Sequence, residues 1–445
     1  MFFKQFFDKH LAQYSYLVGC QRTGESIIID PIRDLGEYEA AAKEEGLKLT
    51  HATETHIHAD FFSGIREAAN KGLEIFVSKY GQDGLAYENM PENTNYICED
   101  DVINVGNVKL EVLHTPGHTP ESISFLLTDI GGGSDTPMGL FTGDFIFVGD
   151  VGRPDLLEKA VDVKGSTIVG AEQMYDSIKK MEPLGDEILI WPGHGAGSPC
   201  GKSLGAVPLS TLGYERQNNW AFNTSDKDEF IHKLTNNQPT PPNHFKEMKL
   251  LNQKGGKKFV PYTAFKKNTD HVKFDIRPKR AYHDGHGFGT INIPYDKNFI
   301  NQIGFFLDYN SPITLVSDKE TDVQNAVHTL QLIGFDSVDG FEEPKNEVET
   351  KQIDSKEVTG EEKQLLDVRN DNEWNNGHLS NAKHLPHNLL HVTEVPFNKD
   401  ETLYVHCQSG IRSSIAVGLL EKTGFKDVVN VKTGYKDIKD EVKEK

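Results

Sequence analysis

An internal repeat constrains the fold of this 445-residue chain more than any other feature. The segment "FDIRPKRAYHDGHGFGTINIP" ends at Pro294, and "LDVRNDNEWNNGHLSNAKHLP" ends at Pro386, 92 positions later. Each copy has the pattern of strand, loop and helix, which predicts a small parallel sheet flanked by helices. We therefore predict two copies of one α/β unit, at 259–347 and 348–445. The residues that recur at the same offset are Asp275, Arg277, His286 and Pro294, repeated as Asp367, Arg369, His378 and Pro386.

The preceding region, 1–258, has a different pattern and is predicted to be a separate domain. Short apolar runs alternate there with turn signals, which predicts strands joined by loops and a few helices. Polar residues with catalytic potential follow the predicted strands, so they are expected to lie in loops at one edge of the sheets. The predicted strands are 26–30, 108–114, 122–127, 139–147 and 187–194, and a helix is predicted at 35–45.

Composition excludes several classes of function. The chain has 67 acidic and 47 basic residues and a net charge of -20, which argues against a nucleic-acid partner. An anionic substrate would need local positive charge, because the overall field repels it. No apolar run reaches the roughly 18 residues of a membrane helix, and charges interrupt the N-terminal segment, so we expect a cytoplasmic protein without a membrane partner. The cysteines are widely spaced, which disfavours a disulfide framework; they are Cys20, Cys98, Cys200 and Cys407.

A set of histidines and aspartates in the first domain suggests a metal site. Imidazole and carboxylate suit zinc, iron or manganese, and two histidines with one carboxylate favour mononuclear non-haem Fe(II). A dinuclear hydrolytic zinc site needs more ligands. Phe61 stands where an imidazole would serve a second ion, so this set favours one metal. The candidate ligands are His56, His58, Asp60, His118, Asp144 and His194.

These motifs resemble the metallo-β-lactamase superfamily, whose pattern is HxHxDH, a later GHT, a GD and a final histidine. Within that superfamily, "THIHADFFSG", "TPGHTPES", "FTGDFIFVGDVGRPDL" and "PTPPNHFKEMKLLN" resemble the persulfide dioxygenases. The resemblance implies an αββα sandwich with one Fe(II) per chain, held by His56, His118 and Asp144, and no organic cofactor. It departs from the superfamily pattern at Phe61.

The resemblance also suggests roles for residues around the metal. It places His58, Asp60 and His194 beside the metal or on the substrate side. Arg153, in "GRPD", is the positive group we assign to an anionic substrate, and a structural salt bridge is the alternative. Cys200, in "GHGAGSPCGKSLG", either touches substrate or packs as a small buried residue.

The segment "VHCQSGIRSS", at 405–414, predicts a reactive cysteine. A strand is expected to end at Cys407 and a helix to begin near Ile411, so loop amides and the helix N-terminus converge on the sulfur. Both favour a thiolate, which is the nucleophilic form. Four residues separate Cys407 from Arg412, a tighter cradle than the five of phosphatases and one suited to a single sulfur atom. The residues expected to bind the persulfide anion are Gln408, Ser409, Gly410, Ile411 and Arg412.

This loop and the "DVR…GHL…A…LP" segment resemble the rhodanese family. The first copy of the repeat has Asp318 in the place of Cys407 and no counterpart of Arg412. We therefore expect an α/β chain with a metallo-β-lactamase-like sandwich and two rhodanese-like domains, of which 259–347 is inactive and 348–445 active.

The whole arrangement resembles the persulfide dioxygenase–rhodanese fusions. It implies oxidation of low-molecular-weight persulfides with O2 to sulfite and thiol, followed by sulfur transfer from Cys407 to sulfite to give thiosulfate. The implied partners are small persulfides, O2 and sulfite, with assembly into a homo-oligomeric dimer or tetramer. Two alternatives remain at this point: a glyoxalase II-type dinuclear-zinc thioester hydrolase fused to a sulfurtransferase, and a non-catalytic sulfur-relay or sensor protein.

Overall fold

The computed structural model describes residues 1–81, 85–161, 163–261, 264–267, 269–358 and 364–438. The chain forms two compact units: Met1–Pro261 with Thr329–Gly334, and Tyr262–His328 with Phe335–Lys445. The last seven residues of the third predicted domain, 439–445, lie outside the described residues. Within the described ranges, every helix is too short or too polar to cross a bilayer.

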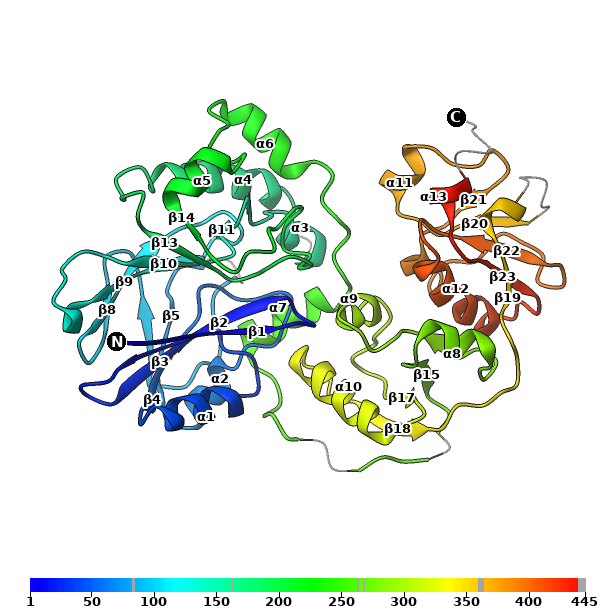
Figure 1. Cartoon of the computed structure of the whole chain (residues 1–445), viewed down its shortest axis with the longest axis horizontal. Coiled ribbons are helices and arrows are strands. Elements are labelled where there is room, and N and C mark those ends of the chain that lie inside the picture. Colours follow the sequence, from blue (N-terminus) through cyan, green and yellow to red (C-terminus); the bar gives the residue numbers. More distant parts are fainter. Residues whose placement is uncertain (82–84, 162, 262–263, 268, 359–363, 439–445) are drawn as a thin grey trace. The chain divides into compact units, whose positions relative to one another are not determined.

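The first unit contains two six-stranded sheets (Figure 1). The first sheet has the order β1-β2-β3-β4-β5-β6, with bounds Phe2–Asp8, Gln13–Cys20, Glu25–Ile29, Lys48–Thr53, Glu74–Ser78 and Thr94–Ile97. The second has the order β14-β13-β10-β9-β8-β7, with bounds Ser210–Thr211, Leu189–Pro192, Gly139–Gly143, Ile123–Asp129, Val108–His114 and Val102–Val105. A short hairpin pairs β11 (Ile146–Phe147) with β12 (Asp150–Val151).

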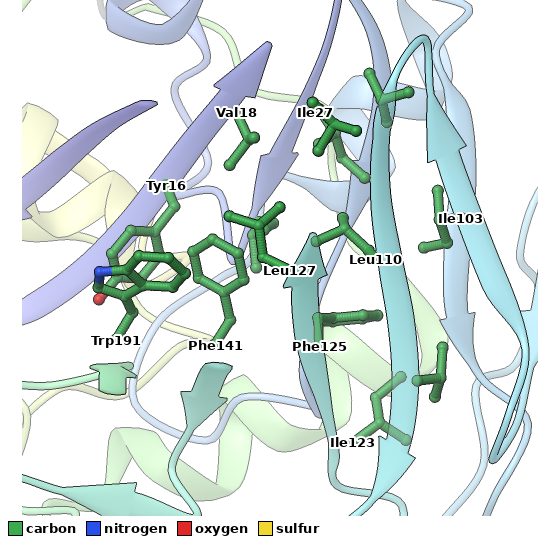
Figure 2. Close-up of a cluster of buried hydrophobic side chains, with 14 of the residues drawn as sticks. Tyr16, Val18, Ile27, Ile103, Leu110, Ile123, Phe125, Leu127, Phe141 and Trp191 are labelled. Atoms are coloured by element: carbon green, nitrogen blue, oxygen red, sulfur yellow. The ribbon is translucent and has the colours of Figure 1, made fainter. Parts of the chain in front are cut away.

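The main core lies between the inner faces of these two sheets. Strand β8 alternates buried and partly exposed residues, so Val108, Leu110 and Val112 all point inward. They belong to one cluster with Tyr16 and Val18 of the other sheet. Figure 2 shows Leu110 in this layer, together with Phe125, Leu127, Phe141 and Trp191. Apolar burial of this kind is the main favourable term in folding.

Helices cover the two outer faces. Helices α1 (Gly36–Glu44) and α2 (Ile65–Asn70) pack on the first sheet, and α4 (Ser166–Lys179) packs on the second. The expected αββα sandwich is confirmed. The other helices of this unit are α3 (Leu156–Val161), α5 (Leu212–Asn218), α6 (Lys227–Thr235), α7 (His244–Lys254) and the 3₁₀ turn η1 (Ile130–Gly132).

One predicted strand was wrong in its extent. The run 139–147 is divided into β10, which ends at Gly143, and β11, which begins at Ile146. Gly143 has a φ of 50°, and a Cβ there would meet Thr55 Oγ1 at 2.2 Å, so the turn requires glycine. The break places Asp144 at the end of a strand, where its carboxylate faces the loops of neighbouring strands.

The second unit contains two all-parallel sheets, one for each copy of the repeat. The first has the order β16-β15-β17-β18, and the second, read from its other edge, β21-β20-β22-β23-β19. The first four strands therefore follow the same order in both copies, as the repeat predicts.

Helices accompany both sheets of the second unit (Figure 1). The middle copy contains β15 (Val272–Asp275), α8 (Lys279–Asp284), β16 (Ile291–Asn292), α9 (Phe299–Ile303), β17 (Ile313–Val316), α10 (Glu320–Leu332) and β18 (Val338–Glu342). The C-terminal copy contains β19 (Lys351–Ile353), η2 (Ser355–Glu357), β20 (Leu365–Asp367), α11 (Asp371–Asn375), β21 (Lys383–His384), η3 (His387–Leu389), β22 (Leu403–His406), α12 (Ile411–Lys422), β23 (Val428–Val431) and α13 (Tyr435–Ile438).

Candidate metal centre and sulfur-carrier loop

Three strand ends of the first unit bring His56, His118 and Asp144 together. They follow β4, β8 and β10, and all three side chains are buried. His118 Nε2 lies 3.4 Å from Asp144 Oδ2, and His56 Nε2 lies 3.9 Å from the same oxygen. One ligand atom from each residue falls within 4.8 Å of the others, close enough for all three to hold one ion.

Hydrogen bonds fix the orientation of both imidazoles. His118 Nδ1 donates to the backbone carbonyl of Arg153 at 2.8 Å. His56 Nδ1 lies 3.0 Å from the hydroxyl of Thr55, which itself donates to Asp30 and so accepts from the imidazole. In both rings the Nε2 lone pair is left facing Asp144. Outer partners of this kind orient the ligands of metal sites.

Burial also keeps the two imidazoles neutral. It lowers the pKa of His56 well below its ordinary value, and the neighbouring His58 and His118 lower it further. Burial likewise lowers the pKa of His118, although the Asp144 carboxylate opposes the shift. A neutral imidazole is the form that binds a metal.

Three buried atoms of this cluster need a partner. Among the described residues, His56 Nε2 and both carboxylate oxygens of Asp144 receive no hydrogen bond. A buried polar atom without a partner costs about 1–3 kcal/mol. A divalent cation would satisfy all three atoms, so the residues present fit a metal with two imidazole ligands and one carboxylate ligand.

Asp60, His194 and Cys200 form a second buried group beside the first. His194 Nε2 lies 3.2 Å from Asp60 Oδ2 and 3.4 Å from Asp144 Oδ1, so Asp144 touches both groups. Burial lowers the pKa of His194, but the two carboxylates outweigh it and raise the pKa well above its ordinary value. Burial raises the pKa of Cys200 to about 12, so this thiol stays protonated at neutral pH.

His58 turns away from these groups toward an aspartate that sequence reasoning missed. Its Nε2 donates to Asp30 Oδ1 at 3.1 Å, and Asp30 also accepts from the Thr55 amide at 2.6 Å. The fully buried Phe61 packs against the His58 ring, with centroids 4.3 Å apart. The available signal for Asp30 was its position as an acidic residue at the end of the predicted strand 26–30.

Arg153 is fully buried, and its guanidinium is paired with a carboxylate. Arg153 Nε and Nη2 donate to Asp155 at 2.6 and 2.7 Å, and Nη1 donates to the Pro199 carbonyl at 3.1 Å. This is the arrangement of a structural salt bridge. The part of Arg153 that reaches the metal centre is its backbone carbonyl, which holds His118; a role toward a substrate anion stays a prediction.

In the second unit, Cys407 occupies the turn between β22 and α12. Its side chain is buried, the Gly410 amide donates to Sγ at 3.1 Å, and the thiol donates to the Ser413 hydroxyl oxygen at 3.7 Å. Gly410 has a φ of 81°, and a Cβ there would meet the Lys432 carbonyl at 1.9 Å, so the turn requires glycine. Gln408 and Ser409 lie in the same turn, and Ile411 is half exposed at the start of the helix.

The guanidinium of Arg412 faces a carboxylate that the sequence did not reveal. Arg412 Nη1 and Nη2 donate to Glu373 at 2.5 and 2.7 Å. Glu373 also closes a capping box with Asn370 at the start of α11, so its sequence context indicated only a helix cap. A role of Arg412 in binding a persulfide anion stays a prediction.

The strand register corrects the expected counterpart of Cys407 in the middle copy. Asp275 pairs with Val316 as Asp367 pairs with His406, so the next residue, Ser317 rather than Asp318, takes the place of Cys407. The turn that follows is one residue shorter, because α10 begins at Glu320. Asp318 is exposed, with Oδ1 4.0 Å from Arg277 Nη1.

Both the metal-site region and the C-terminal copy of the repeat match known families. Residues 9–194 match the family model of the metallo-beta-lactamase superfamily, and residues 347–441 match that of the rhodanese-like domain. A crystal structure of a metallo-beta-lactamase from Staphylococcus aureus subsp. aureus COL is 59% identical, with a TM-score of 0.74, and the match covers 77% of this chain and 99% of that one.

Two curated relatives resemble the first unit. The mitochondrial persulfide dioxygenase ETHE1 of Mus musculus is 29% identical over 243 residues, which cover 54% of this chain and 82% of the mouse protein. A hydroxyacylglutathione hydrolase of Rhodospirillum rubrum is 34% identical over 183 residues, which cover 41% of this chain and 61% of the hydrolase. The chain belongs to the metallo-beta-lactamase superfamily and carries a rhodanese-like domain after its metallo-beta-lactamase domain.

Proposed function

We propose that this protein oxidises low-molecular-weight persulfides with O2 at one iron ion and then transfers a further sulfur atom from Cys407 to the resulting sulfite. The observation that carries the first step is the cluster of His56, His118 and Asp144, with neutral imidazoles and three buried atoms that need a cation. Similarity to a protein named persulfide dioxygenase supports the choice of substrate. The proposed domains are those predicted from sequence, at 1–258, 259–347 and 348–445.

The overall oxidation balances as RSSH + O2 + H2O giving RSH, sulfite and two protons. The outer sulfur loses four electrons, and O2 gains them. Iron(II) bound by the three ligands would supply the electron transfer to O2 that this change requires. The protein holds the Nε2 lone pairs in place through Thr55 and the Arg153 carbonyl, and the buried surroundings exclude bulk water.

The transfer step uses the Cys407 thiolate as a nucleophile. It attacks the outer sulfur of a second persulfide, the S–S bond breaks, and the carrier leaves as RS⁻. A sulfite lone pair then attacks the outer sulfur of the Cys407 persulfide, and the electron pair of the broken S–S bond returns to Cys407 as thiosulfate leaves. The Gly410 amide, 3.1 Å from Sγ, is placed to stabilise negative charge on that sulfur.

Metal analysis combined with an oxygen electrode tests the first step. The wild-type protein should contain one iron per chain and consume oxygen when a persulfide is added. Asp144→Ala removes the carboxylate ligand and should lose both bound iron and oxygen uptake. Asp135→Ala, in an exposed loop of the same unit, is the matched control and should behave as wild type. Two zinc ions per chain without oxygen uptake would overturn the proposal.

One observation favours a second candidate, a thioester hydrolase with two metal ions. Asp144 lies between the two buried groups, with Oδ2 toward His118 and Oδ1 toward His194, as a carboxylate shared by two ions would. The similarity to a hydroxyacylglutathione hydrolase agrees with this reading. Phe61 weighs against it, because its apolar ring packs beside His58 and offers no ligand.

A further inference from the structure

The middle copy contacts one face of α12, the helix that begins after the Cys407 loop. The contacts recur every three or four residues of α12, so they share one face of that helix. They run from its N-cap to its last turn, because α12 extends from Ile411 to Lys422. The contacted positions are Gly410, Ser414, Gly418 and Glu421.

Glu421, in the last turn of α12, is held by two groups of the middle copy. Its carboxylate lies 3.1 Å from His286 Nε2 and accepts from the Gly289 amide at 3.0 Å. His286 Nδ1 donates to the carbonyl four residues before it at 3.0 Å, as His378 does in the C-terminal copy. The backbone bond is therefore a feature of the repeat, whereas the bond to Glu421 joins the two copies.

The two copies also meet closely at the centre of α12. A Cβ on Gly418 would lie 2.0 Å from the Thr290 carbonyl oxygen, so the helix comes this close to the backbone only because the residue is glycine. Ser414, one turn earlier, is buried, and its hydroxyl lies 2.8 Å from His283 Nε2. Burial and the charge of Lys279 lower the pKa of His283 to about 4, so this contact joins two neutral groups at neutral pH.

The first turn of α12 contacts both the middle copy and the sulfur of Cys407. The Gly410 amide donates to Sγ at 3.1 Å, and the Ser413 hydroxyl accepts from the thiol at 3.7 Å. The middle copy contacts the same turn at the Gly410 carbonyl, 3.4 Å from Lys279 Nζ, and at Ser414, the neighbour of Ser413. A shift of this turn would therefore move both polar groups relative to the sulfur.

We propose that the middle copy positions the first turn of α12 and thereby stabilises the thiolate of Cys407, with His283 and Ser414 as positioning residues. This inference rests on the proposed function, in which Cys407 carries sulfur. A hydrogen bond to a charged atom weakens steeply when its distance or angle changes, so a small displacement of the Gly410 amide costs much of its effect. The middle copy thus contributes to sulfur transfer without a thiol of its own.

Alkylation of Cys407 by iodoacetamide, measured on the full chain by mass spectrometry of the Cys407 peptide, tests the proposal. At pH 7 the rate follows the fraction of thiolate, whereas near pH 10 the thiol is ionised in every variant. His283→Leu removes the contact with Ser414 and should slow alkylation about tenfold at pH 7, as expected when a hydrogen bond to a charged sulfur is weakened, with little change near pH 10. His283→Gln keeps a hydrogen-bonding group at about the position of Nε2 and should restore most of the rate.

Two further variants complete the comparison. Ser414→Ala removes the other partner of the contact and should slow alkylation at pH 7 as much as His283→Leu, and the double variant should be no slower than either. Arg280→Gln is the matched control on α8, because the Arg280 side chain is 94% exposed, and it should react as wild type does. The charges of Lys279 and Arg412 are present in every variant and therefore cancel from the comparison.

The proposal is overturned if either single variant, His283→Leu or Ser414→Ala, alkylates at the wild-type rate at pH 7, or if the slowing is equal at both pH values. It is also overturned if His283→Gln is as slow as His283→Leu, or if the losses add in the double variant. The assay uses neither persulfide nor iron. Slow alkylation in the variants together with no thiosulfate from the wild type would therefore reject the proposed sulfur transfer and leave the positioning role standing.

Discussion

The two copies of the repeat share the order of four strands, and the loop after the central strand differs between them. In the middle copy, Arg277 pairs with Asp275 at 2.7 Å and donates to the Gly285 carbonyl at 2.9 Å. In the C-terminal copy, Arg369 pairs with Asp367 at 2.6 Å and donates to the Gly377 carbonyl at 2.8 Å. Gly377 is the counterpart of Gly285 in the repeat. The recurring aspartate and arginine therefore stabilise each copy, and their presence says nothing about catalysis.

The difference lies where the central strand meets its helix. The C-terminal copy places a buried thiol there, with the Gly410 amide on its sulfur. The middle copy places Ser317 at the same register position and shortens the turn by one residue. A hydroxyl barely ionises near pH 7, so this loop offers no thiolate. The scaffold is therefore kept although the middle copy has no thiol at this position, and three experiments separate the scaffold from the loop.

The largest effect should come from breaking the shared scaffold. Burial alone would raise the pKa of Asp367, but the buried His406 and the Arg369 guanidinium hold it below its ordinary value. Arg369→Met would leave that buried carboxylate without its guanidinium partner, at a cost of about 3–5 kcal/mol. Hydrogen exchange of amides in β20 and β22 should report that loss, and Arg277→Met should give a similar loss in β15 and β17. A loss in only one copy would show that the shared pair does not play the same part in both.

A smaller effect should distinguish the copies by pH. Burial, reinforced by the charge of Arg412, lowers the pKa of His387 to about 3, and the residue 92 positions earlier is Tyr295. The unfolded histidine has a pKa of about 6.5. Below that pH the unfolded state binds a proton that the folded state does not bind, so stability is complete above about pH 6.5 and falls as the pH is lowered toward 3.

When the pH is lowered from 7 to 5, His387 should therefore reduce the free energy of unfolding of the C-terminal copy by about 2 kcal/mol. His387→Phe keeps a buried ring without a titrating group and should remove this part of the pH dependence. Hydrogen exchange of β20 and β22 amides at the two pH values gives the comparison. Equal pH dependence in wild type and variant would contradict the assignment to His387.

The smallest effect is expected in the loop of the middle copy. Ser317→Ala and Asp318→Ala remove the two polar side chains of that turn, and neither residue has a thiol to carry sulfur. Thiosulfate formation should stay within about twofold of wild type. A large loss in either folded variant, measured as thiosulfate per oxygen consumed, would mean that the middle loop takes part in the reaction.

Much of this architecture could be predicted from sequence because the patterns were local. The repeat at offset 92 predicted the shared strand order, and the motifs around His56, His118 and Asp144 predicted residues that do lie together.

The features of the two sites that could not be predicted from sequence depend on contacts between distant segments. Asp30 reaches His58 from the end of β3, 28 positions away, and Glu373 reaches Arg412 from 39 positions away. The sequences of the two copies suggested that Asp318 is the counterpart of Cys407, whereas the strand pairing shows that it is Ser317. Aligning the two sequences did not resolve this difference of one residue. Only the paired strands establish which residue follows which strand end.

We propose that sulfur transfer depends on Cys407, because among the described residues of the two copies only this loop places a thiol after the central strand. The most direct measurement is the yield of sulfite and thiosulfate from one persulfide under air, in wild type and in Cys407→Ser. We expect the variant still to consume oxygen, and its product to shift from thiosulfate to sulfite. Unchanged thiosulfate, after correction for the uncatalysed reaction of sulfite with persulfide, would contradict it and would direct attention to Cys200.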